Sequence, residues 1–131
     1  MQVSLENTNS GFINNEVLTD DMNYSVPDLT YLRELSGGDE IFVKDMIAFF
    51  IEHAPELLHL MKEYALSGDH EKLRFAAHKL LSDLAFVGLP SAFAEVKKIE
   101  NESKFMDDLF IVIERVIKTI NLGIIDLRKM I

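Results

Sequence analysis

The segment 73–89 holds the residues of this chain that are best placed for chemistry, with His78 near its centre. It contains no proline and no glycine before Gly88, and its apolar residues recur every three or four positions, which predicts a helix. At about 100° per residue, these apolar residues fall on one side and form the stripe that a helix buries. We assign to this stripe Leu73, Ala76, Ala77, Leu80, Leu84 and Val87.

His78 points to the other side of the predicted helix, toward solvent. Its expected neighbours there are Arg74, Phe75, Leu81, Ser82 and Ala85. Large apolar side chains on an outward face are typical of a docking surface. An imidazole that is neutral at pH 7 has an unprotonated ring nitrogen, which is a competent nucleophile for phosphorus. On this pattern alone, a surface histidine without a role is the more common case, and a nucleophile within a docking face is the alternative.

Composition narrows the possible partners. The chain has 131 residues, about one domain, of which 48% are apolar and 27% charged, as in soluble globular proteins. A net charge of −9 makes nucleic acid and anionic membranes poor partners. The longest wholly apolar run, 46–51, is too short to span a bilayer. Because cysteine is absent and no secretory signal is visible, we expect a cytoplasmic protein, and we expect it to be a monomer.

The chain divides into an arm and a helical domain. Residues 1–26 contain four acidic residues and no lysine or arginine, which predicts a flexible acidic arm. Residues 27–131 show amphipathic helical segments separated by Gly-containing turns, with no alternating β pattern. We therefore predict an all-α fold, an antiparallel four-helix bundle with one or two short additional helices. We also expect a kink or restart at Pro55 and a stop or kink at Gly123.

The run Ala77-His78-Lys79-Leu80, followed by Gly88-Leu89, resembles the signature of histidine-containing phosphotransfer (HPt) domains. That signature is roughly Ala-His-x-Leu-Lys-Gly, then small residues and a Gly at the tenth position after the His. The similarity extends from Asp28 to the pair Ile99-Glu100 and includes Gly37-Gly38-Asp39. Two positions depart from it: the usual Lys is Leu81, and the usual Gly or other small residue is Ser82.

The resemblance implies an HPt-like bundle and a role as a phosphocarrier in a His-Asp phosphorelay. His78 would accept a phosphoryl group from the Asp of a response-regulator receiver domain and pass it to another receiver. The implied partners are receiver domains and a hybrid sensor histidine kinase. The protein would need no cofactor, because the receiver brings Mg²⁺, and it would have no independent turnover as an enzyme. In the family the Lys is thought to steady the phosphoryl group, so Leu81 leaves an alternative: an HPt-like receiver-binding module with weak or no phosphotransfer.

The remaining candidates are grouped by the role that we expect of them. Arg74 and Ser82, one turn before and after His78, could contact phosphoryl oxygens, and solvated surface residues are the alternative for both. The predicted docking residues are Phe75, Leu81, Ala85 and Phe86. For these, the alternative is that the arm or a neighbouring helix covers some of them. Gly88 has a structural role as the helix terminus. The other histidines lack the spacing of metal ligands, so we expect no metal site.

Overall fold

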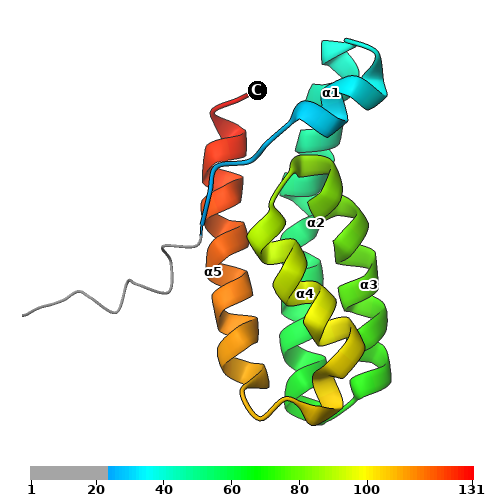
Figure 1. Cartoon of the computed structure of the whole chain (residues 1–131), viewed down its shortest axis with the longest axis vertical. Helices are drawn as coiled ribbons and strands as arrows, with labels where there is room; N and C mark the ends of the chain where they lie inside the picture. Colours follow the sequence, from blue (N-terminus) through cyan, green and yellow to red (C-terminus); the bar gives the residue numbers. More distant parts are fainter. Residues whose placement is uncertain (1–23) are drawn as a thin grey trace, which may run out of the picture.

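The computed structural model describes residues 24–131, and all regular structure within them is helical. The helices are α1 (Thr30–Ser36), α2 (Glu40–Ser67), α3 (His70–Val87), α4 (Pro90–Glu102) and α5 (Leu109–Arg128), with a short 3₁₀ helix η2 (Ser103–Phe105) after α4. The four long helices run alternately up and down beside one another, and α1 lies at one end of this bundle (Figure 1). The predicted all-α fold is confirmed. Within the described residues, no helix is long and apolar enough to cross a membrane.

Helix α3 occupies a central position in the packing, because it contacts α4 and α2 extensively and α1 and η2 to a smaller extent. Its predicted buried stripe is confirmed, since every member lies in the hydrophobic core. The start of α3 is capped by Asp69, whose carboxylate accepts a hydrogen bond from the backbone N–H of Lys72 at 3.1 Å. Asp39 caps α2 in the same way through the N–H groups of Ile41 and Phe42.

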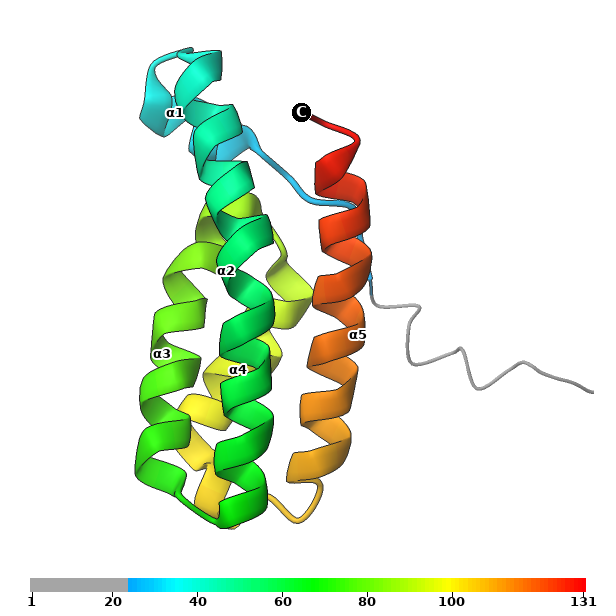
Figure 2. The ribbon, with the colours of Figure 1, turned by 180° about the vertical axis from the view of Figure 1, so that it is seen from behind.

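Helices α2 and α5 each continue past a residue at which the sequence predicts a kink or an interruption. Of the kink or restart expected at Pro55, the restart is wrong, because α2 continues without a break from Glu40 to Ser67, as Figure 2 shows. Phe50 and Leu58, one on each side of the proline, are both buried in the core, so tertiary packing outweighs the local effect of the proline. Of the stop or kink expected at Gly123, the stop is also wrong, because α5 continues to Arg128. A Cβ atom at Gly123 would lie 2.8 Å from Cδ1 of Leu89, so this glycine permits a close approach to α5.

Tyr24, which precedes the predicted boundary at residue 27, contacts the helical domain. Tyr24 packs against the core, and its hydroxyl group donates a hydrogen bond of 2.5 Å to Oδ2 of Asp126 in α5. Burial, together with this hydrogen bond to a carboxylate, raises the pKa of Tyr24 well above its ordinary value. The rest of the predicted arm, residues 1–23, lies outside the described residues.

Gly88 ends α3 as predicted and joins it to the segment before α1. Its backbone is left-handed, with φ of +67°, and its carbonyl oxygen accepts a hydrogen bond of 3.0 Å from the N–H of Asp28. A Cβ atom at this position would collide with the backbone of Asp28. Glycine is therefore needed here for two reasons, the backbone conformation and the close approach.

We expect Gly88→Ala to lower the free energy of unfolding more than Gly68→Ala does. Both glycines are left-handed, with φ of +67° and +74°, and an alanine there costs about 1–2 kcal/mol. At Gly68 the added Cβ would have no atom within 4 Å, whereas at Gly88 the backbone of Asp28 must move. Urea denaturation of the two variants measures the difference. Equal losses of stability would contradict the close approach at Gly88.

Candidate functional site

His78 lies near the middle of α3 with 70% of its side chain exposed. Its Nδ1 is 2.6 Å from Oε2 of Glu100, which projects from α4. A carboxylate can only accept a hydrogen bond, so Nδ1 carries the hydrogen and donates it. In the neutral ring, the lone pair then lies on Nε2, for which the described residues provide no partner. The exposed imidazole is thus held in one tautomer, with Nε2 as its available nucleophile.

Glu100 is kept ionised by its surroundings. Only 10% of its side chain is exposed, and its Oε1 is 3.4 Å from Nζ of Lys97. Burial alone would raise the pKa of Glu100, but the hydrogen bonds from His78 and Lys97 hold the pKa below its usual value. An ionised carboxylate at this position orients the ring and stabilises positive charge that develops on it.

Sequence reasoning did not assign a role to Glu100, although the resemblance ended at this residue. His78 and Glu100 are 22 positions apart and belong to different helices. Helical periodicity describes the face of one helix and does not predict which residue of the next helix lies opposite. The available signal was the pair Ile99-Glu100, in which a buried residue is followed by a carboxylate.

On its other side, His78 borders a groove between α2 and α3 with a volume of about 610 Å³. The ring of His53 stacks on that of Phe49 at a centroid distance of 3.9 Å, and its Nδ1 donates to the carbonyl oxygen of Phe49 at 2.8 Å. Burial raises the pKa of Asp83 on the α3 wall, against the opposing effect of His53. The residues that line this groove are Phe49, His53, Glu56, Leu57, Leu60, His78, Lys79, Ser82 and Asp83.

The two predicted phosphoryl neighbours lie on different sides of His78. Ser82 is exposed and shares the groove with His78, together with Lys79. Arg74 instead lines a second cavity, on the side of Glu100, and its guanidinium lies 5.2 Å from the ring centroid of Phe75. The structure therefore brings Ser82 and Lys79 together with His78 in one groove, and it places Arg74 beside Glu100.

One of the four predicted docking residues is not on the surface. Phe75 and Ala85 are exposed, and Phe86 is partly buried and stacks on Tyr31 of α1 at a centroid distance of 6.0 Å. Leu81 is only 7% exposed, so the prediction that it belongs to an outward patch is wrong. Because α3 packs against α4 as well as α2, the buried side of α3 does not end at Ala77. It also includes Leu81, which lies about 40° further round the helix axis than Ala77.

Comparisons with models of protein families, with curated proteins and with solved structures find no match for this chain. Residues 24–131 contain no group of three or more His, Asp or Glu side chains that could hold a metal ion. The functional proposal therefore depends on the exposed imidazole, its carboxylate partner and the groove beside them.

We expect Leu81→Asp to reduce stability by about 3 kcal/mol or more, because it places a charge in the core without a partner. Ala85→Asp, one turn later on the exposed side, is the matched control and should cost within about 1 kcal/mol through helix propensity and the helix dipole. Thermal and urea unfolding measure both. Similar stability of the two variants would show that Leu81 is accessible to solvent.

The tautomer of His78 should depend on Glu100. Glu100→Ala removes the acceptor, so the ring should become a mixture of two tautomers. Glu100→Gln keeps an amide oxygen that can accept the Nδ1 hydrogen, so this variant should retain the tautomer of the wild type. The ¹⁵N chemical shifts of the His78 ring nitrogens distinguish the forms. An unchanged spectrum in Glu100→Ala would show that the hydrogen bond does not determine the tautomer.

Proposed function

We propose that this protein is a monomeric, cytoplasmic phosphocarrier of a His-Asp phosphorelay and that His78 is its phosphoacceptor. The observation that carries the proposal is an exposed imidazole whose Nδ1 is held by a largely buried carboxylate. An imidazole without a role does not need a defined tautomer. A nucleophile does, because the reacting nitrogen must present its lone pair to the incoming phosphorus.

The chemistry that we propose is a transfer between an aspartyl phosphate of a receiver domain and Nε2 of His78. The lone pair of Nε2 attacks phosphorus, the N–P bond forms, and the bond from phosphorus to the aspartate oxygen breaks and returns a carboxylate. The ring gains positive charge as the N–P bond forms, and the ionised Glu100 lies 2.6 Å from the opposite ring nitrogen, where it offsets this charge. No general base is needed, because Nε2 already has its lone pair. The reverse step delivers the group to a second receiver.

The charge of the phosphoryl group needs cations around it, and the family lysine is absent. Lys79 lies in the groove that His78 borders, and Lys97 is paired with Glu100. Phosphoryl transfer depends mainly on position and on charge stabilisation. We propose that Lys79 contributes this stabilisation on the groove side and that the hydroxyl group of Ser82 donates to a phosphoryl oxygen, while the receiver supplies Mg²⁺.

A second candidate function rests on the burial of Leu81. Leu81 occupies the position at which the HPt signature has a lysine, and it is only 7% exposed. The chain therefore has no ammonium group at this position to direct toward a phosphoryl oxygen. A protein of this kind could retain the partner surface and transfer slowly or not at all. The proposed surface consists of the groove with the exposed rings of Phe49 and Phe75, and the occupant is again a receiver domain.

Phosphotransfer should require His78 and should not require another histidine of equal exposure. We expect the wild type to become labelled by a phosphorylated receiver from a panel, in a product that is labile to acid and stable to base. His78→Gln should abolish the label and change stability by less than about 0.5 kcal/mol. His59→Gln is the matched control, because the exposed fractions of the two side chains are 69% and 70%. Labelling of His78→Gln would contradict the site.

Binding measurements on the same panel separate the two candidate functions. A receiver that binds and transfers its phosphoryl group supports the phosphocarrier. A receiver that binds without transfer within the lifetime of its aspartyl phosphate supports the interaction module. If no receiver in the panel binds or transfers, both proposals are rejected for that panel.

A further inference from the structure

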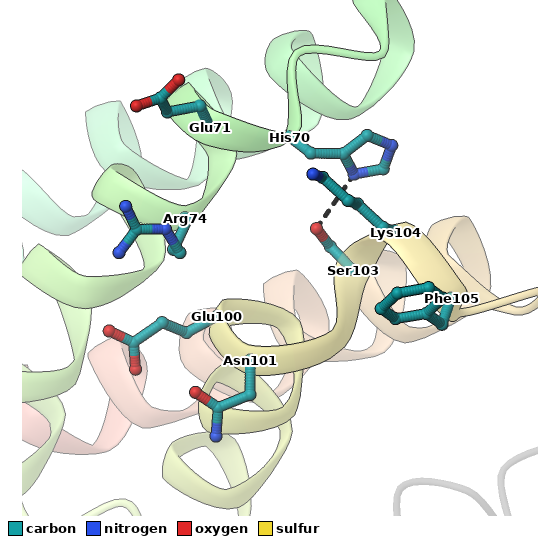
Figure 3. Close-up of a pocket in the computed structure, with 8 residues that line it drawn as sticks. All are labelled: His70, Glu71, Arg74, Glu100, Asn101, Ser103, Lys104 and Phe105. Atoms are coloured by element: carbon teal, nitrogen blue, oxygen red, sulfur yellow. Dashed lines mark hydrogen bonds between the residues drawn. The ribbon is translucent and has the colours of Figure 1, made fainter.

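A second cavity, with a volume of about 430 Å³, lies between the start of α3 and the end of α4. Figure 3 shows its side chains: Arg74 and Phe105 lie at opposite ends, and Ser103 and Lys104 lie between them. The volume is within the range of small-molecule sites. His78 does not line this cavity, so it is distinct from the groove of the proposed phosphocarrier site.

Two cations, Arg74 and Lys104, line the cavity. Within residues 24–131, neither Arg74 nor Lys104 forms an ion pair, and the guanidinium of Arg74 lies 5.2 Å from the ring centroid of Phe75. Two carboxylates also line the cavity. The charge of Glu100 is already paired with Lys97 and hydrogen-bonded to His78, and Glu71 is exposed to solvent. The lining thus carries two cations and two carboxylates, and Arg74 and Lys104 are the groups available to hydrogen-bond an anionic group.

The wall between these ends is polar and ordered. Ser103 is 6% exposed and is the one buried polar or charged residue among those that the structure describes. Its hydroxyl group is 2.9 Å from Nδ1 of His70, a contact between two residues that are 33 positions apart. This hydrogen bond fixes both side chains at the cavity, so the polar lining does not have to be ordered when a ligand binds. Asn101 adds an amide that can both donate and accept.

At the far end, the ring of Phe105 is 83% exposed, the highest exposure of any large apolar side chain in residues 24–131. An exposed aromatic face at the edge of a cavity is suited to stacking with a planar ring. The cavity thus combines Arg74 at one end, Lys104 and an amide along its wall, and an aromatic face at the other end. We propose that it binds a mononucleotide, with the phosphate at Arg74 and Lys104, the base on Phe105 and the amide of Asn101 at a base edge.

Adenosine 5′-monophosphate is the probe for this site, with adenosine and inorganic phosphate as its two halves. We expect the monophosphate to shift the amide resonances of Arg74, Ser103 and Phe105 saturably in ¹⁵N-labelled full-length protein at constant ionic strength. Each half alone should bind at least about tenfold more weakly, because it loses either the charge-assisted hydrogen bonds or the stacking. The proposal is overturned if no saturable shift occurs, or if phosphate alone binds as tightly as the nucleotide.

Variants identify the residues that bind. Lys104→Gln should weaken binding of the monophosphate about tenfold, and Phe105→Ala should weaken it at least about fivefold. Lys44→Gln and Phe110→Ala change exposed residues of the same types elsewhere and should bind as the wild type does. Affinities unchanged in both cavity variants would overturn the proposal. Because His78→Gln should bind normally, this site and the phosphocarrier function can fail independently of each other.

Discussion

Helix α3 buries side chains against both α2 and α4, and this double packing confines its exposed residues to one continuous strip of its surface. His78 stands on that strip, so the two neighbouring helices form its surroundings directly. Helix α4 supplies Glu100 on one side, and α2 forms the wall of the groove on the other. An imidazole placed in this way is positioned by three packed helices and by no loop, which favours a fixed geometry.

The direction in which His78 points is determined by contacts far from it. At one end of α3, the Asp69 carboxylate caps the first turn. At the other, Gly88 approaches the backbone of Asp28 so closely that no side chain fits between them. The two ends fix the position of α3 along its axis, and the fully buried Leu80 and Leu84 fix its rotation. A change at Gly88 would therefore act on the site through the orientation of the helix, without contact with the imidazole.

The sequence predicted what depends on one helix and failed where two helices meet. Periodicity identified the buried stripe of α3 and the exposure of His78, and local chemistry identified the end of α3 at Gly88, because these features involve residues close together in the chain. The burial of Leu81 depends on α4 covering the edge of the stripe. The partnership of His78 with Glu100 depends on how α3 and α4 are aligned along each other. Likewise, Pro55 is accommodated because the core holds both sides of α2.

The pairing of Glu100 with Lys97 resolves a conflict within the proposed mechanism. Before transfer, an ionised carboxylate beside Nδ1 is favourable, because it holds the tautomer and stabilises the ring as it becomes positive. After transfer, a phosphoryl group adds up to about two negative charges on the opposite ring nitrogen, which the same carboxylate repels. The ammonium group of Lys97, 3.4 Å from Oε1, reduces this repulsion. Exposure of the ring lets solvent screen the remainder, so a protein of net charge −9 can carry the added group.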